Sequence, residues 1–94
     1  MVIIELVYTK PLSEVDKHLV SHRAFLRQGY QEGKFIASGP KNPRDGGIIV
    51  ALGSKEEVTA LMKNDPFHQH DIASYHFTEF DPVLHCEALN TLLK

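Results

Sequence analysis

Runs of β-branched and aromatic residues alternate along the chain with segments in which apolar residues recur at helical spacing. The apolar runs predict four strands, at residues 2–9, 34–39, 48–52 and 72–80. The helical spacing predicts two helices, at residues 14–32 and 55–64. The order β-α-β-β-α-β is that of the split βαβ unit, so the pattern predicts an α+β protein of ferredoxin-like fold. A short amphipathic helix is expected at the end of the chain, in residues 83–94.

Capping and turn residues support these boundaries. Ser13 is placed to cap the first helix, and Ser54 and Glu57 form a capping box at the start of the second. Pro66 ends the second helix, because a proline disfavours helical backbone at the residue before it. Asp45-Gly46 is a strong hairpin signal between the second and third strands.

Apolar residues occupy both faces of the predicted sheet. In the first strand Ile3 and Val7 alternate with the equally apolar Val2, Ile4 and Leu6, whereas a sheet with one face in water alternates apolar and polar residues. A chain of 94 residues also buries only about 60–65% of its unfolded surface. We therefore expect the tail helix to cover part of the second face and a second subunit to cover the rest, as a face-to-face homodimer.

Composition and charge narrow the classes of partner. Lys and Arg total 10 and Asp and Glu total 12, a net charge of −2, whereas binding to nucleic acid needs a basic surplus. No apolar run approaches the roughly 20 residues that span a bilayer, and the sequence MVIIELVYTK lacks the basic leader of a signal peptide. We expect a single cytoplasmic domain over residues 1–94, with neither nucleic acid nor a membrane as its partner. The one cysteine, Cys86, excludes a disulfide framework and is expected to be a packing residue in the tail helix.

His22 is the first candidate for chemistry. It lies near the centre of the apolar stripe of the first helix, with Val15, Leu19, Leu26 and Tyr30, and should point at the sheet. An imidazole titrates near neutral pH, so His22 can act as a general base or acid. The alternative is a buried histidine with both ring nitrogens satisfied.

Asp65 and the segment Ser38-Gly39-Pro40 are further candidates. Asp65 follows the second helix, and it can approach His22 because both helices of this fold lie on one face of the sheet. It can then orient the imidazole or act as a second acid or base; the alternative is the turn-forming Asp that often precedes proline. Ser38-Gly39-Pro40 offers a hydroxyl and room for close backbone approach, or is simply the exit from the second strand.

The remaining histidines suggest a metal site that the spacing does not complete. His18 and His22 lie one helical turn apart, and His68 and His70 precede His76. No carboxylate or cysteine is spaced to complete a set of three or four zinc ligands. We therefore expect solvated histidines and no metal, and the sequence assigns no role to His68, His70 and His76. Nucleotide-binding and hydrolase motifs are absent from the sequence, so no cofactor is expected.

Together these motifs resemble the YciI family, also called YCII-related proteins. The shared pattern has a His in the first helix, an acidic-Gly pair at its end, a Gly-Pro after the second strand, a Gly before the third and an Asp-Pro-aromatic after the second helix. In this chain the pattern is formed by His22, Glu32-Gly33, Ser38-Gly39-Pro40, Gly46 or Gly47, and Asp65-Pro66-Phe67. The resemblance extends from the first strand to the fourth.

The resemblance implies a dimeric α/β barrel in which two sheets face each other, with a catalytic pair in a pocket, here His22 and Asp65. The motif residues implied to contact the substrate are Ser38, Gly39, Pro40 and Phe67. Relatives often have an Arg before the helix histidine, whereas here Ser21 precedes it and Arg23 follows it. The resemblance therefore implies that Arg23 takes over any binding of an anionic substrate.

A function follows from the residues and the resemblance together. We expect a cofactor-free enzyme of lyase or isomerase type, in which His22 moves a proton on a small cyclic or carbonyl-bearing substrate and Asp65 orients His22. Similar proteins include dehydrochlorinase-type enzymes of chlorinated-aromatic breakdown, and the wider superfamily includes muconolactone isomerases and small monooxygenases. The alternative is a non-catalytic module that binds a small ligand or a partner protein in the same dimer cleft.

Overall fold

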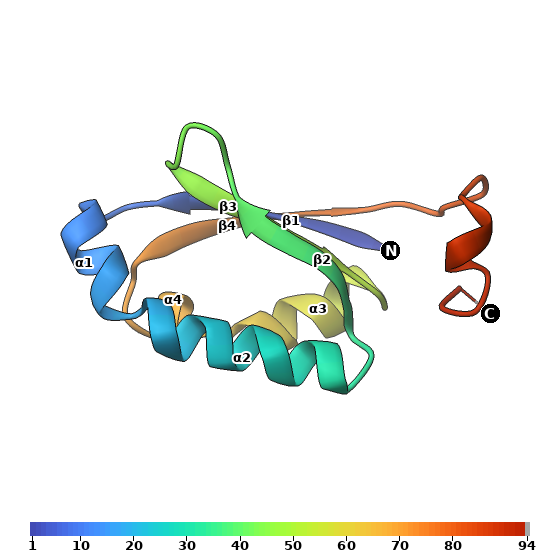
Figure 1. The fold of residues 1–94 in the computed structure, drawn as a ribbon, viewed down its shortest axis with the longest axis horizontal. Helices are drawn as coiled ribbons and strands as arrows, with labels where there is room; N and C mark the ends of the chain where they lie inside the picture. Colours follow the sequence, from blue (N-terminus) through green and yellow to red (C-terminus); the bar gives the residue numbers. More distant parts are fainter. Residues whose placement is uncertain (94) are drawn as a thin grey trace.

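A four-stranded antiparallel sheet with helices against one face forms the protein in the computed structural model, which describes residues 1–93 (Figure 1). The strands, in the spatial order β2-β3-β1-β4, are β1 (Val2–Tyr8), β2 (Phe35–Pro40), β3 (Gly46–Ala51) and β4 (Ala73–Glu79). The helices are α1 (Leu12–Lys17), α2 (Leu19–Gln31), α3 (Lys55–Met62) and α4 (Pro66–Gln69), followed by a 3₁₀ turn, η1 (Glu87–Leu89). The predicted ferredoxin-like α+β fold is confirmed. Among the described helices, none combines the length and apolar composition needed to cross a membrane.

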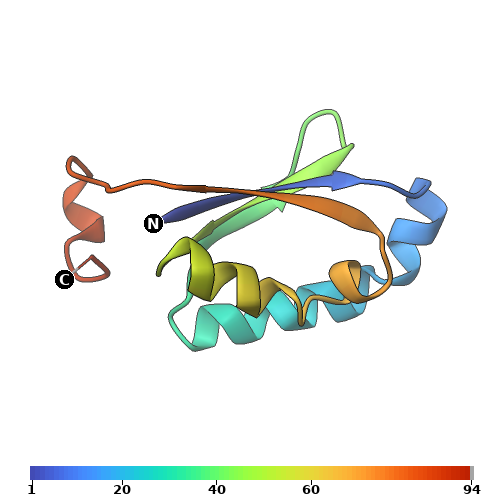
Figure 2. The same ribbon diagram turned by 180° about the vertical axis from the view of Figure 1, so that it is seen from behind.

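The core lies between the sheet and the helices beneath it. The helices α2, α3 and α4 lie on one side of the sheet (Figures 1 and 2). Strand alternation buries one set of apolar side chains on that side. The strands contribute the buried residues Val2, Ile4, Leu6, Ile49 and Ala51, and the helices contribute Val15, Val58, Met62 and Phe67.

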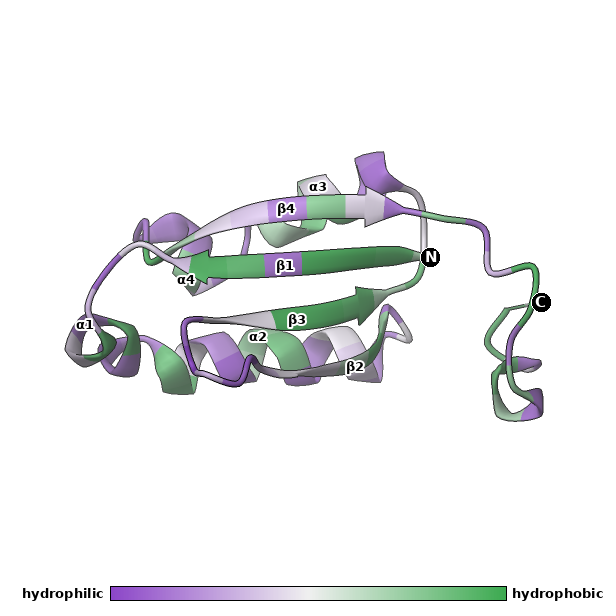
Figure 3. Cartoon of the chain, turned by 90° about the horizontal axis from the view of Figure 1, so that it is seen from above, coloured by the Kyte–Doolittle hydropathy of each residue, from purple (hydrophilic) through white to green (hydrophobic). Residues whose placement is uncertain are grey.

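The opposite face of the sheet carries apolar residues that remain partly exposed. Ile3 pairs with Val50, and Glu5 pairs with Ile48 in the register of β1 and β3; Val7, on the same face, is 41% exposed. Figure 3 looks down on this face, where β1 and β3 are coloured hydrophobic over most of their length. No helix of the described residues lies over it (Figures 1 and 2). The prediction that both faces are apolar is therefore confirmed for β1 and β3, whereas β4 places the exposed polar residues Ser74, His76 and Thr78 on this face.

The tail does not supply the expected cover. Instead of the helix expected over residues 83–94, the described part of the tail forms the turn η1, which lies beyond the end of the sheet (Figure 1). Val83 is 85% exposed and Leu84 is 91% exposed, because after Asp81 the chain continues away from the sheet. Cys86 is likewise exposed, so the prediction that it is a packing residue is wrong. Lys94 lies outside the described residues.

The first predicted helix is two helices that meet at His18. His18 ends α1 and begins α2 with φ −110° and ψ 5°, outside regular helical backbone. The change of direction lets α1 bury Val15 completely at the end of the sheet, while α2 runs along its face. Pro11 is the N-cap of α1, and Ser13 makes no capping hydrogen bond, contrary to the sequence prediction.

The second predicted helix begins as expected and ends earlier. The capping box is present: Ser54 Oγ accepts from the Glu57 N–H and Glu57 Oε1 accepts from the Ser54 N–H, each at 3.1 Å. The one-turn helix α4 then starts at Pro66, so His68 lies in a helix, in a segment for which the sequence predicted none. Proline suits this first helical position, where an N–H has no acceptor.

Replacing Ser54 with Ala removes the acceptor of the capping box. We expect the free energy of unfolding to fall by about 0.5–2 kcal/mol, measured by urea denaturation. Ser13→Ala is the matched control, because Ser13 makes no capping bond, and it should change stability by less than about 0.5 kcal/mol. Equal losses in the two variants would contradict this assignment of the caps.

Candidate functional site

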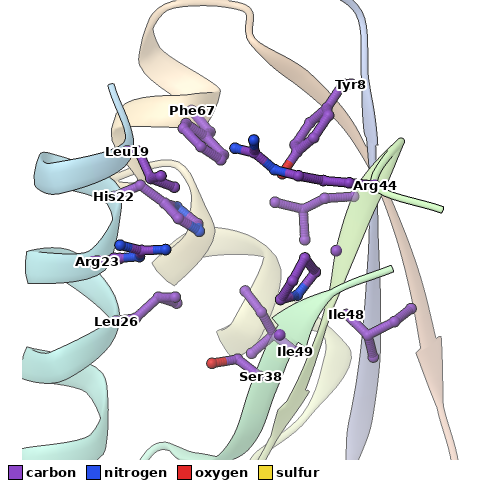
Figure 4. Close-up of a pocket in the computed structure, with 14 residues that line it drawn as sticks. Tyr8, Leu19, His22, Arg23, Leu26, Ser38, Arg44, Ile48, Ile49 and Phe67 are labelled. Carbon is purple, nitrogen blue, oxygen red and sulfur yellow. The ribbon is translucent and has the colours of Figure 1, made fainter. Parts of the chain in front are cut away.

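A cavity of about 250 Å³ lies between α2 and the β2–β3 hairpin (Figure 4). The structure brings all the predicted site residues to this place. Six of them line the cavity: His22, Arg23, Ser38, Gly39, Pro40 and Phe67. Asp65 does not line it and lies directly behind His22.

His22 presents one ring nitrogen to the protein and the other to the cavity. Its side chain is 10% exposed, and Nδ1 lies 2.7 Å from Asp65 Oδ1. A carboxylate can only accept, so Nδ1 carries the proton and donates it. Within residues 1–93, Nε2 makes no hydrogen bond, yet every buried side-chain nitrogen or oxygen has a partner, so Nε2 is open to the cavity. The ring of Phe67 stacks on the imidazole at 3.9 Å between centroids and an angle of 3°, which fixes the plane of the ring.

Asp65 is a completely buried carboxylate with three donors. It has 0% exposure. Oδ1 accepts from His22 Nδ1 and, at 3.1 Å, from the Phe67 N–H, while Oδ2 accepts from the Tyr75 hydroxyl at 2.6 Å. The bond to Phe67 makes Asp65 the N-cap of α4. Both roles considered from the sequence are therefore present in one side chain: Asp65 begins the turn at Pro66, and it also holds the imidazole.

Tyr75 is a site residue that the sequence pattern did not single out. It lies on β4, opposite Leu6 in the register, and so faces the helices. Burial, then the charge of Asp65 and the hydrogen bond to it, raise the pKa of Tyr75 well above its ordinary value. The hydroxyl therefore remains a donor to Asp65 throughout the neutral range. The period-two alternation with Phe77 was the signal that could have placed Tyr75 on this face.

The β2 end of the cavity is formed by Ser38 and the two residues that follow it. Ser38 pairs with Ile49, and its hydroxyl lies 2.7 Å from the Tyr30 hydroxyl. A Cβ on Gly47 would lie 3.1 Å from the carbonyl oxygen of Gly39. A side chain at position 47 would therefore crowd the neighbouring strand at Gly39.

Tyr8 and Arg44 line the cavity on the side opposite α2. Neither residue was predicted from the sequence. Tyr8 follows Leu6 by two residues in β1, so strand alternation predicts its direction. Arg44 lies in the β2–β3 loop, a turn-rich segment whose sequence carries no periodic signal. Its Nη2 lies 2.7 Å from Asp16 Oδ1, and its Cζ lies 6.0 Å from the centre of the Tyr8 ring. The hydrogen bond to Asp16 raises the pKa of the Arg44 guanidinium.

The other histidines do not gather around this cavity. His18 and His70 stack on each other at 4.2 Å between centroids, and the His68 ring lies 5.5 Å from that of Tyr75. In the part of the chain that the structure describes, no group of three or more His, Cys, Asp or Glu side chains is placed to hold a metal ion.

Comparisons with known proteins identify the family of the sequence and a solved structure of similar fold. The model of the YCII-related domain matches residues 1–81, and no curated protein matches the sequence. Among solved structures, the fold is similar to 5-chloro-2-hydroxyhydroquinone dehydrochlorinase (TftG) from Burkholderia phenoliruptrix AC1100, in complex with 2,5-dihydroxybenzoquinone. The TM-score is 0.70 at 18% identity, over 86% of this chain and 94% of that chain. At this identity the likeness shows the shared fold.

Replacing Tyr75 with Phe removes one of the three donors to the buried carboxylate. A hydrogen bond to a charged group contributes about 1.5–3 kcal/mol, so we expect the free energy of unfolding at pH 7 to fall by about that amount in urea denaturation. The dependence on pH is a sharper test. Because the pKa of Tyr75 is higher in the folded protein than in the unfolded chain, where it is about 10, this contribution is fully present below about pH 10. Above pH 10 the wild type should lose about 1.4 kcal/mol per pH unit more than the variant.

Tyr30→Phe is the control for that experiment, since it removes a hydroxyl from an exposed pair and leaves Asp65 untouched. It should cost less than about 1 kcal/mol. If wild type and Tyr75→Phe lose stability equally above pH 10, Tyr75 does not donate to Asp65 as described.

Proposed function

The chain belongs to the family of YCII-related proteins, and from this premise we propose that it is a small enzyme of lyase or isomerase type. The side chains of His22 and Asp65 would transfer a proton on a small cyclic or carbonyl-bearing substrate. One observation carries the proposal: the 2.7 Å hydrogen bond from His22 Nδ1 to the fully buried Asp65, at the wall of a cavity. A histidine serving only the core would have both ring nitrogens paired.

The geometry supports general-base chemistry at Nε2. Because Asp65 holds the proton on Nδ1, the lone pair of Nε2 is directed into the cavity. When Nε2 takes a proton from a carbon next to a carbonyl, the electron pair of that C–H bond passes into the carbonyl system as an enolate. The imidazolium formed lies against the Asp65 carboxylate, which stabilises its charge. Returning the proton to another carbon completes an isomerisation, and departure of a leaving group with its electron pair completes an elimination.

The structural neighbour supports the same class of chemistry. TftG is a dehydrochlorinase crystallised with 2,5-dihydroxybenzoquinone, a planar cyclic dicarbonyl compound. Loss of hydrogen chloride requires a proton to move and a chloride to depart, which is the elimination described above. We therefore include cyclic dicarbonyl and hydroxyquinone compounds among the substrates proposed for this chain.

Deuterium exchange tests the proposal across several classes of compound at once. The protein is incubated in D₂O with cyclic ketones, lactones and hydroxyquinones, including 2,5-dihydroxybenzoquinone, and deuterium incorporation or conversion is followed by proton NMR. We expect the wild type to transform at least one compound and His22→Gln to reduce that rate by about 10²–10⁴-fold. Asp65→Asn should also slow it, because the amide oxygen can still accept from His22 Nδ1 and the Phe67 N–H but carries no charge to stabilise the imidazolium.

Arg27→Gln is the matched control for these variants. Arg27 is an exposed residue of α2 that does not line the cavity, so the variant should keep the wild-type rate. Compounds that bind but are exchanged equally by the wild type and His22→Gln would contradict the enzyme and indicate a non-catalytic binding module.

A homodimer through the open face of the sheet is also part of the proposal. Ile3, Ile48 and Val50 remain partly exposed there, and the tail leaves that face uncovered (Figure 2).

Light scattering of the wild type should give about twice the chain mass of 10.6 kDa. Val50→Glu should shift the mass towards one chain, because it places a charge next to Ile3 on the apolar part of this face. Ala60→Glu, which adds the same charge at an exposed position of α3, should remain a dimer; a wild type of one chain mass in dilute solution contradicts the proposal.

A further inference from the structure

Two guanidinium groups face the cavity, and the proton transfer proposed above uses neither. The lining residues include Arg23 and Arg44 but no Asp or Glu. The carboxylate of Asp65 lies behind His22 and is already bonded by three donors. The surface that a ligand would meet is therefore positively charged, in a protein whose net charge is −2.

Arg44 is held in place with most of its donors unused. Asp16 of α1 accepts from Nη2 at 2.7 Å, and the guanidinium lies over the edge of the cavity formed by Tyr8. A guanidinium carries five N–H donors, so several remain for a ligand after this contact. Because the Asp16 contact fixes the side chain in advance, less conformational entropy is lost when a ligand binds.

Arg23 approaches the same space from the other wall. It follows His22 directly in α2, and its side chain makes no ion pair within residues 1–93. Figure 4 shows Arg23 extending from the helix and Arg44 extending from the opposite wall, on either side of the His22 ring. The two cations therefore flank the nitrogen proposed as the base.

We propose that Arg23 and Arg44 form a subsite for the carboxylate of a small, otherwise apolar substrate. This inference rests on the proposed function in that it names the substrate class of the same cavity. The remainder of the lining is largely apolar, with Leu6, Leu19, Leu26, Ile49 and Phe67. A cavity of about 250 Å³ is smaller than those that hold drug-sized ligands, roughly 300–1,000 Å³, so the body of the substrate is a single ring or a short chain.

A carboxylate bound in this subsite also orients the rest of the substrate. Guanidinium groups bind carboxylates through charge-assisted hydrogen bonds of fixed geometry. A carboxylate held between the two arginines leaves the rest of the molecule against Phe67 and Nε2 of His22. A neutral compound of the same shape lacks this anchor and is held only by the apolar walls.

Binding of benzoate, with benzamide as its neutral isostere, tests the subsite. Affinity is measured by calorimetry and by ¹⁵N NMR shifts of the Gly39 and Gly47 amides, which belong to cavity-lining residues. We expect benzoate to bind the wild type at least 10-fold more tightly than benzamide and to lose about 10-fold or more in each of Arg23→Gln and Arg44→Gln. Arg27→Gln, which removes an exposed arginine of the same helix outside the cavity, should bind as the wild type does, and Arg44→Lys should retain part of the affinity because it keeps the charge.

The proposal is overturned if benzoate does not bind, binds no better than benzamide, or binds the Arg23→Gln and Arg44→Gln variants as tightly as the wild type. Thermal unfolding of each variant shows that it is folded, and Arg23, which is exposed, tolerates replacement even if Arg44 does not. The binding measurement requires no turnover. If benzoate binding depends on the arginines but no compound is exchanged, the proposed enzyme activity is contradicted and the anion subsite is supported. If a compound is exchanged but benzoate binding does not depend on the arginines, only the subsite is contradicted.

Discussion

The burial of the Asp65 carboxylate constrains how the elements around the cavity are positioned. An ionised carboxylate at 0% exposure is tolerated only when donors replace the water it has lost. Here the three donors come from three different elements: His22 of α2, the Phe67 N–H of α4 and Tyr75 of β4. Satisfying this single group therefore fixes the distance between the long helix, the short helix and an edge strand. A change at any of the donors leaves the same buried charge short of a partner.

The Asp65 carboxylate also links the stability of the fold to the proposed proton transfer. The hydrogen bond that satisfies Asp65 also determines which nitrogen of His22 carries the proton, and hence which nitrogen meets the cavity. Phe67 takes part twice, since its backbone N–H bonds the carboxylate and its ring stacks on the imidazole. The donors to Asp65 consequently hold the imidazole in one orientation, and the arrangement on which the proposed general-base chemistry depends is present before any ligand binds.

The errors made from the sequence have a common physical cause. Periodicity extends the first helix through His18, but burying Val15 at the end of the sheet requires a change of direction there. The tail has an amphipathic pattern, yet its described residues form only a short 3₁₀ turn, and Leu84 stays 91% exposed. In both segments the apolar residues recur at helical spacing, but tertiary packing determines where a helix forms and how long it is.

Local patterns in the chain were enough to predict the order of strands and helices, the capping box at Ser54, the apolar residues on both faces of β1 and β3, and the candidate pair His22 and Asp65. These features depend on spacing, on caps and on residue types at turns, which act over a few residues. The packed fold was needed to show that Tyr75 completes the environment of Asp65 and that Arg44 reaches the cavity wall opposite Arg23. Tyr75 comes from a strand whose register selects its partner, and Arg44 comes from a loop held by a contact 28 residues away along the chain. Such contacts have no local signal, because they exist only once the sheet and the helices are packed against each other.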